Sequence, residues 1–273
     1  GLLMRRLASI LALLPALAFA QTPLTTADDW QSVVQTAAPS SWFAFAAGTY
    51  QLTGTPLIVT SGWTRIEGSG PESTYLVAAA NTNVVRVTAT NVVLAGLTIT
   101  GGDAAAAAGG VIGHGLTLVT NCVVVSNRNV GNNYTAGGLI GCTVFNSTIA
   151  NNSSTNSGDS GSGGVYFTHA AAVVDSCVVV SNSSKTDGGG IGAQYNGRKG
   201  SIINSTVRWN YAGGGGGAAH FAYATNSVFE FNSCGTRGGG GIGGYYGFIY
   251  AENCVVVSNT SAAHGGGAHK GAM

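Results

Sequence analysis

Residues 121–127 read Asn-Cys-Val-Val-Val-Ser-Asn, and close copies of this seven-residue motif recur down the chain. The later copies are 146–152 (NSTIANN), 176–182 (SCVVVSN), 204–210 (NSTVRWN), 226–232 (NSVFEFN) and 253–259 (NCVVVSN). From Asn127 to Asn259, the closing asparagines follow at steps of 25, 30, 28, 22 and 27 residues. A glycine cluster comes after every copy, as at Gly188–Gly190. Units of this length, each with one short strand and one glycine turn, predict a repeat solenoid.

The alternation of side chains along a strand predicts which positions of the motif face the core. Position four is apolar in every copy: Val124, Ile149, Val179, Val207, Phe229 and Val256. Positions three and five admit Thr206, Arg208 and Glu230, so they should face solvent, while positions two, four and six face inward. Trp209 and Phe231 at position six should then thicken the core. The asparagine at position seven is expected to turn the corner and to stack as an amide ladder.

The N-terminus, residues 1–20, has the form of an export signal. Arg5 and Arg6 supply positive charge, Leu7–Leu17 an apolar run, and Ala18–Ala20 a small-residue cleavage site. A buried helix is the alternative interpretation, and the apolar run is short for a membrane span. We expect cleavage of the signal and a protein that resides outside the cell or on its surface, including the outer membrane.

The remaining residues, 21–273, are expected to form a single β-helix domain of about nine coils. A helix over 26–38, which Thr26 can cap, should cover the first coil. Its apolar face carries Trp30, Val33, Val34 and Ala37. Residues 42–101 alternate short β-like runs with turns and predict irregular first coils, while residues 102–273 carry the Asn- and Gly-punctuated repeats.

Composition favours a folded protein and argues against several kinds of ligand. The 273 residues include 44 glycines, against about 19 at average usage. The formal net charge of +1 gives no support for nucleic-acid binding. Gly239–Gly244 matches a dinucleotide fingerprint, but no helix pattern follows it, so no cofactor is expected. His264 and His269 lack a third ligand, so no metal site is expected either.

Five cysteines leave at least one without a partner inside the chain. Cys122, Cys177 and Cys254 share position two with serines in the other copies, which indicates small buried residues. Cys122 and Cys177 would lie two coils, or about 9.6 Å, apart, which is beyond disulfide reach. The redox state of Cys142 and Cys234 is left open.

The motif resembles a known family. Phe229–Asn232 followed by Gly238–Ile242 is similar to the Phe-x-x-Asn and Gly-Gly-Ala-Ile repeats of the polymorphic outer-membrane proteins. Gly48–Tyr50 and Leu94–Gly102 resemble the first coils of secreted bacterial right-handed β-helix repeat proteins. This resemblance implies a right-handed, pectate-lyase-like β-helix acting as an adhesin or autotransporter passenger. No barrel or anchor follows before Met273, so a truncated C-terminus is expected.

The competing interpretation is an enzyme, because pectate lyases and related polysaccharide lyases and hydrolases share the parallel β-helix. A glycosidase needs two carboxylates that face each other across the substrate, and a calcium-dependent lyase needs clustered carboxylates with a basic residue. Asp159, Asp175 and Asp187, near Lys185 and Arg198, are the candidate catalytic cluster. Solvated corner residues are the alternative. The leading hypothesis has no catalytic residue and is a non-enzymatic scaffold.

Aromatic residues beside the glycine turns indicate a possible binding face. The candidate residues are Tyr195, Tyr211, Tyr223, Tyr245, Tyr246 and Tyr250. Rings on a long solenoid face can stack on sugars or contact a partner protein, so carbohydrate or a cell-surface protein is the expected partner. Packing inside wider coils explains the same residues equally well.

Overall fold

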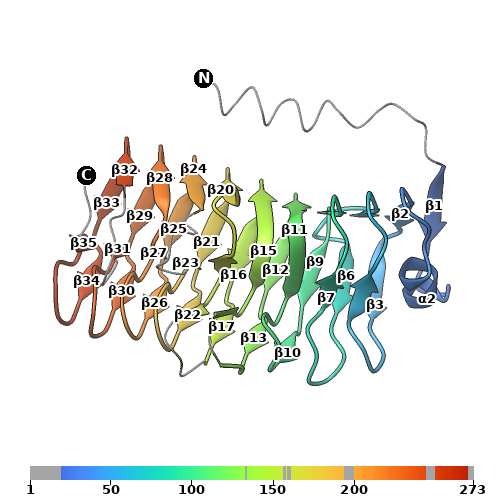
Figure 1. The fold of residues 1–273 in the computed structure, drawn as a ribbon, viewed down its shortest axis with the longest axis horizontal. Helices are drawn as coiled ribbons and strands as arrows, with labels where there is room; N and C mark the ends of the chain where they lie inside the picture. The colour runs from blue at the N-terminus through green and yellow to red at the C-terminus, as the bar shows by residue number, and fades with distance from the viewer. Residues whose placement is uncertain are drawn as a thin grey trace.

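The computed structural model describes residues 20–132, 134–155, 158, 161–193, 200–243 and 250–269. The chain winds as a parallel β-solenoid, with the N-terminal strand at one end of the long axis and the C-terminal coils at the other (Figure 1). Residues 1–19 of the expected export signal lie outside the described residues.

The coils contribute strands to three sheets, which we call sheets A, B and C, and sheet C begins only at β10. Sheet B contains β3 (Gly48–Gln51), β6 (Thr74–Val77), β9 (Thr98–Thr100), β12 (Val123–Val125), β16 (Thr148–Ala150), β21 (Val178–Val180), β25 (Thr206–Arg208), β29 (Val228–Glu230) and β33 (Val255–Val257). Sheet C contains β10 (Asp103–Ala104), β13 (Arg128–Asn129), β17 (Ser153–Ser154), β22 (Ser183–Ser184), β26 (Tyr211–Ala212), β30 (Ser233–Cys234) and β34 (Thr260–Ser261).

Sheet A is the largest of the three and carries one or two strands from each coil. It contains β1 (Gln21–Leu24), β2 (Trp42–Phe45), β4 (Leu57–Val59), β5 (Arg65–Gly68), β7 (Val85–Val87), β8 (Val93–Ala95), β11 (Val111–Thr120), β15 (Leu139–Phe145), β19 (Val165–Phe167), β20 (Val173–Asp175), β23 (Ile191–Ala193), β24 (Ser201–Ile203), β27 (Ala219–His220), β28 (Tyr223–Thr225), β31 (Ile242–Gly243), β32 (Tyr250–Glu252) and β35 (Ala268–His269). A small extra pair joins β14 (Thr135–Ala136) to β18 (Gly161–Ser162).

The copies of the motif stack in register. Val179 lies between Ile149 of the preceding coil and Val207 of the next, and all three side chains are fully buried. This stacking makes a right-handed solenoid of about eight turns. The fold class that the repeats predict is therefore confirmed.

The inward and outward positions agree with the expected alternation over the first five residues of the motif. Cys122 and Val124 are buried, whereas Val123 and Val125 are half-buried. The alternation ends at position six, where Ser126 has a left-handed φ of 57°. That turn returns the next residue to the interior, because a left-handed residue interrupts the extended strand.

Two expectations about the end of the motif are therefore wrong. Position six does not face inward: Trp209 and Phe231 are 51% and 49% exposed, and their φ angles are 54° and 55°. The closing asparagine does not turn the corner, because the left-handed residue is Ser126 before it and Asn127 itself is buried. Position one is left-handed as well, as Asn121 shows with φ 50°, so each motif lies between two left-handed corners.

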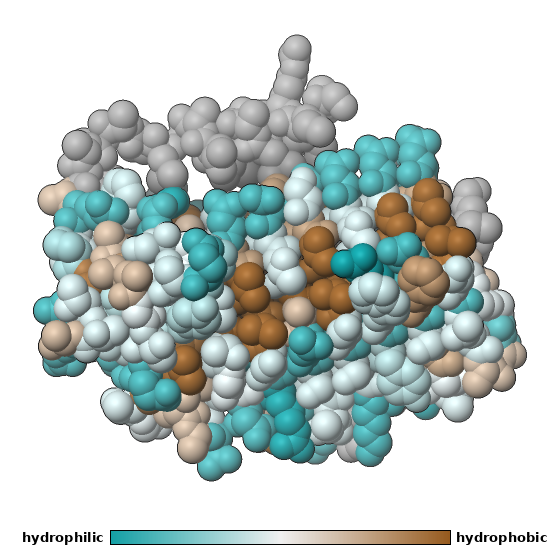
Figure 2. Space-filling view, turned by 180° about the vertical axis from the view of Figure 1, so that it is seen from behind, coloured by the Kyte–Doolittle hydropathy of each residue, from teal (hydrophilic) through white to brown (hydrophobic). Residues whose placement is uncertain are grey.

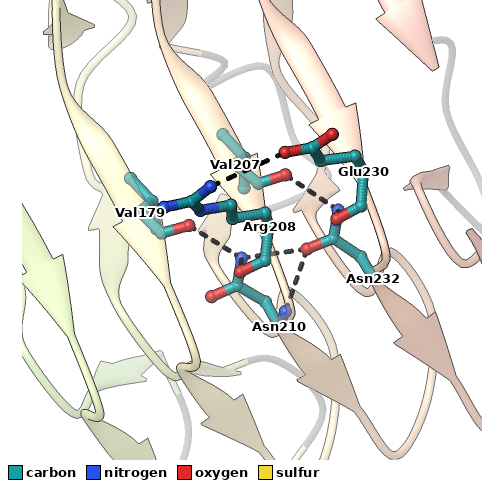
Figure 3. Close-up of polar contacts among 6 residues, drawn as sticks. All are labelled: Val179, Val207, Arg208, Asn210, Glu230 and Asn232. Carbon is teal, nitrogen blue, oxygen red and sulfur yellow. Dashed lines mark hydrogen bonds and ion pairs between the residues drawn. The ribbon is translucent and has the colours of Figure 1, made fainter. Parts of the chain in front are cut away.

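The closing asparagines, which are buried except for the half-buried Asn259, form an asparagine ladder, which confirms that expectation (Figure 3). Its members are Asn127, Asn152, Asn182, Asn210, Asn232 and Asn259. The side-chain amide of Asn210 donates to Val179 O at 3.0 Å and to Asn232 Oδ1 at 2.9 Å. Asn232 Oδ1 also accepts from the backbone N–H of Asn210 at 2.9 Å. Each rung thus satisfies backbone and side-chain groups that are hidden from water.

The glycine clusters let neighbouring coils come close to the asparagine ladder. A Cβ at Gly164 would lie 2.5 Å from the carbonyl oxygen of Gly190 and 3.3 Å from the side chain of Asn182. The first distance is a clash with backbone that cannot move aside. Any larger residue would therefore force the coils apart at this corner.

The N-terminal helix α2 (Trp30–Gln35) is shorter than the expected span of 26–38. Its N-cap is Asp29 without a side-chain cap bond, so Thr26 does not cap it, and Val33 is exposed. Trp30 packs edge-on against Phe45 and Tyr50 of the first coil, at 5.9 Å and 5.4 Å between ring centroids. No helix within the described ranges is long and apolar enough to cross a membrane.

Candidate functional site

The tyrosines of the expected binding face are distributed over two sheets. Tyr195, Tyr245 and Tyr246 lie outside the described residues. Tyr223 and Tyr250 are aligned neighbours in sheet A, whereas Tyr211 belongs to sheet C. All three described side chains are exposed, which favours a surface role for them over interior packing.

Tyr223 and Tyr250 form a stacked pair on the outer surface of sheet A. Their ring centroids are 5.6 Å apart and their planes differ by 20°. The residues are 43% and 51% exposed, respectively. Ser201 on the preceding coil aligns with Tyr223. The row of exposed aromatic residues therefore begins at Tyr223, because the residue before it in the row is a serine. The pair offers an apolar surface with phenolic hydroxyl groups, which is suited to carbohydrate or protein contacts.

A second aromatic group lies at the corner between sheets B and C. Trp209 and Phe231 stack at 6.1 Å between centroids, and the guanidinium of Arg208 lies 4.5 Å from the Trp209 centroid. Arg208 also pairs with Glu230 at 3.9 Å (Figure 3). This exposed group was missed because position six was assigned to the core. The polar residues at that position in the other copies, Ser126, Asn151, Ser181 and Ser258, were the signal for an exposed corner.

Exposed apolar residues do not merge into one patch on the face seen in Figure 2. The brown surface there forms several separate groups, divided by pale and teal residues. Large continuous apolar patches are typical of obligate protein interfaces. This face therefore resembles an ordinary solvent-exposed surface.

The candidate carboxylates do not gather at one place. Asp175 ends β20 in sheet A, and its Oδ1 accepts hydrogen bonds from the Ser176 hydroxyl at 2.9 Å and the Asn204 amide at 3.0 Å. Asp187 comes after β22 in sheet C, so strands β21 and β22 separate it from Asp175 along the chain. Asp159 lies outside the described residues.

Asp187 lines a small surface cavity of about 80 Å³. The cavity is lined by Gly158, Lys185, Thr186, Asp187, Gly213, Gly214, Thr236 and Arg237. Asp187 is 8% exposed, and its Oδ1 accepts the backbone N–H of Gly215 at 2.7 Å. The structure thus places one carboxylate of the expected cluster beside two basic side chains.

His220 is buried close to this carboxylate, at the end of sheet A strand β27. Burial lowers the pKa of His220 below its usual value, and the charge of Asp187 opposes that shift. Its Nε2 has no hydrogen-bond partner within the described part of the chain. The imidazole is therefore neutral at neutral pH.

Other carboxylates hold coils together. Glu67 pairs with Arg65 at 2.8 Å, and this hydrogen bond holds the pKa of the Glu67 carboxyl below its usual value. Asp103 pairs with Arg128 of the next coil at 3.3 Å. Arg65 and Glu67 lie on the same strand, and the contact of Glu67 with the preceding sheet A strand is the hydrogen bond that its Oε2 accepts from Trp42 Nε1 at 3.1 Å. The Asp103–Arg128 pair joins consecutive strands of sheet C.

All five cysteines are free thiols. Burial raises the pKa of Cys122 and Cys142 to about 12 and that of Cys177 to about 11. Cys142 and Cys234, whose redox state the sequence left open, are both free and buried. Because a thiolate is the reactive form, the three thiols with raised pKa values are unreactive at neutral pH.

Histidines and acidic groups do not form a metal-ligand cluster of three or more within the ranges that the structure describes. The rings of His264 and His269 lie nearly parallel, with 4.2 Å between centroids and 5° between planes. Parallel rings stack on each other and do not direct two nitrogens at one ion.

Comparison with known proteins gives a fold likeness. No family model and no curated protein matches the chain. The solved structure of pectate lyase Pel9A aligns with a TM-score of 0.52 and 13% identity, over 93% of this chain and 78% of its own. The PL6 family alginate lyase AlyGC aligns with a TM-score of 0.29 and 10% identity, over 80% of this chain and 44% of its own. The first likeness shows a pectate-lyase-like β-helix fold alone, and the second supports no conclusion.

Proposed function

We propose that this chain is an exported, non-enzymatic β-solenoid that binds carbohydrate along sheet A. The observation that carries the proposal is the stacked, half-exposed pair Tyr223 and Tyr250 on consecutive coils. Aromatic rings bury large apolar area while their hydroxyl groups stay hydrated, a combination that suits the mixed surface of a sugar. The protein acts as a scaffold that presents this pair outside the cell or on its surface.

The arrangement of the candidate carboxylates supports a binding role over catalysis. Glycoside hydrolysis requires two carboxyl groups about 5–10 Å apart across the substrate. Asp175 and Asp187 lie at different corners of the coil, and both accept hydrogen bonds from the fold. Their contacts are those of corner residues that hold turns in place.

Export is part of the same proposal. It is supported by the charged start at Arg5 and Arg6, the apolar run Leu7–Leu17 and the small residues Ala18–Ala20. An adhesin-like or passenger role follows from the repeat resemblance together with this signal. The partner is then a glycan on a cell surface or in the surrounding matrix.

The double variant Tyr223→Ser, Tyr250→Ser is expected to bind its preferred polysaccharide about tenfold more weakly. Each lost ring contact is worth ~0.5–1.5 kcal/mol, and ~1.4 kcal/mol corresponds to a tenfold change in Kd. The full chain is first screened against a panel of neutral and acidic polysaccharides, and the Kd values are then measured by calorimetry.

The control is Trp63→Asn, which removes an exposed ring from a left-handed corner in the N-terminal part of the solenoid. Asparagine accepts that backbone conformation, so the coil is preserved. Equal affinity in wild type and the tyrosine double variant, with both folded, contradicts the proposed face.

A polysaccharide lyase or hydrolase is the second candidate. It is favoured by the cavity that brings Asp187 together with Lys185 and Arg237, and by the likeness of the fold to a pectate lyase. In that case Asp187 would be the acidic member of the site. A depolymerisation assay distinguishes this candidate from the scaffold.

A further inference from the structure

The cavity beside Asp187 lies where three consecutive coils leave sheet C. Sheet C strands β22, β26 and β30 stack consecutively, and the cavity residues follow directly after them. Lys185 follows β22, Gly213 and Gly214 follow β26, and Arg237 comes after β30. The two glycines let the coils approach closely here, since a Cβ at Gly213 would lie 2.2 Å from Lys185 O and a Cβ at Gly214 would lie 2.3 Å from Asp187 Oδ1.

The two basic residues at this cavity form no ion pair with a carboxylate in the part of the chain that the structure describes. Among the described residues, Arg65, Arg128 and Arg208 each form an ion pair, whereas Lys185 and Arg237 form none. Both side chains are exposed. Two unpaired cations on alternate coils that line one cavity create a local excess of positive charge.

Asp187 is the one carboxylate in the described lining of the cavity, and it does not cancel this charge. Asp187 is 8% exposed, and its Oδ1 is already bonded to the Gly215 N–H at 2.7 Å. Among the described residues that line the cavity, two cations and one carboxylate leave a formal excess of one positive charge. A ligand with one negative group would complete the balance.

We propose that this cavity binds one oxyanion, which is a sulfate, phosphate or carboxylate group, between Arg237 and Lys185. The Arg237 guanidinium can donate two parallel hydrogen bonds to two oxygens of such a group, and the Lys185 ammonium supplies a compact positive charge. The hydroxyl groups of Thr186 and Thr236, which line the cavity, are further donors. The volume of about 80 Å³ exceeds the ~10–15 Å³ that one water molecule needs and suits a group of this size. This site lies apart from Tyr223 and Tyr250 and does not depend on the function proposed for them.

The test is calorimetric titration of the full chain with three probes at low ionic strength, where surface charge is least screened. The probes are inorganic phosphate, inorganic sulfate and a uronic-acid oligosaccharide. Arg237→Gln and Lys185→Gln should each weaken binding about tenfold or more, because a hydrogen bond to a charged group is lost. The control is Arg86→Gln, which removes an exposed positive charge from strand β7. Melting temperatures confirm that all variants are folded.

The outcomes separate the two sources of the anion. Binding of phosphate or sulfate that the cavity variants weaken and Arg86→Gln does not supports a free oxyanion. The same pattern with the oligosaccharide alone supports a carboxylate carried by a glycan. Binding of no probe, or equal loss in the control and the cavity variants, overturns the proposal.

Discussion

The Val179→Asp variant is expected to be strongly destabilised. Val179 is fully buried at position four, between Ile149 and Val207 of the neighbouring coils. A carboxyl group there has no partner and must be buried charged or be forced to its neutral form. Such lesions cost ~4 kcal/mol or more, a large part of a typical total of about 5–15 kcal/mol. Thermal unfolding followed by circular dichroism measures the loss.

Val178→Asp is the matched control, because it makes the same change one residue away on the same strand. Val178 is half-buried at position three and lies between Thr148 and Thr206. A carboxylate there reaches water, so the expected loss in the free energy of unfolding is about 1 kcal/mol or less. Equal losses in the two variants would mean that the faces of the strand are assigned wrongly.

The Asn182→Ala variant is expected to lose roughly 3 kcal/mol or more of unfolding free energy, although alanine fits the space. The Asn182 amide donates to Ile149 O at 2.9 Å and Asn210 Oδ1 at 3.0 Å. Its Oδ1 accepts from the backbone and the side chain of Asn152, both at 3.0 Å. Alanine leaves these buried groups without partners, each at ~1–3 kcal/mol. Denaturant unfolding provides the free energy.

Ser181→Asn is the control for the asparagine ladder. Ser181 is an exposed left-handed corner residue with φ 55°, next to Asn182 in the chain. Asn151 already occupies the equivalent position one coil earlier with φ 53°. The control should therefore keep the stability of the wild type. A small loss in Asn182→Ala, similar to that of the control, would show that the ladder does not stabilise the fold.

The solenoid could be predicted because its repeating motif is visible in the amino-acid sequence. A parallel solenoid stacks the equivalent residues of successive coils on one another. The apolar residues Ile149, Val179 and Val207 therefore recur at one position of the motif. The end of the motif could not be predicted by alternation. Trp209 and Phe231 adopt left-handed backbone, which bulky side chains rarely do. That conformation reversed the inward and outward assignment for the last two positions.

Surface sites were harder to predict, because they depend on contacts between coils. Tyr223 and Tyr250 are 27 residues apart yet stack at 5.6 Å, since the register of sheet A aligns them. Asp175 and Asp187 are 12 residues apart yet lie at different corners. Spacing along the chain does not show which corner a residue occupies when coil lengths vary.

The measurement that tests the scaffold most directly follows binding and cleavage in the same sample. The full chain is incubated with neutral and acidic polysaccharides, with and without added calcium, and bound sugar and newly formed chain ends are both measured. We expect retention of at least one polysaccharide without new chain ends, and the same result for Asp187→Ala. Sustained cleavage by the wild type that Asp187→Ala abolishes would contradict the scaffold and identify an enzyme.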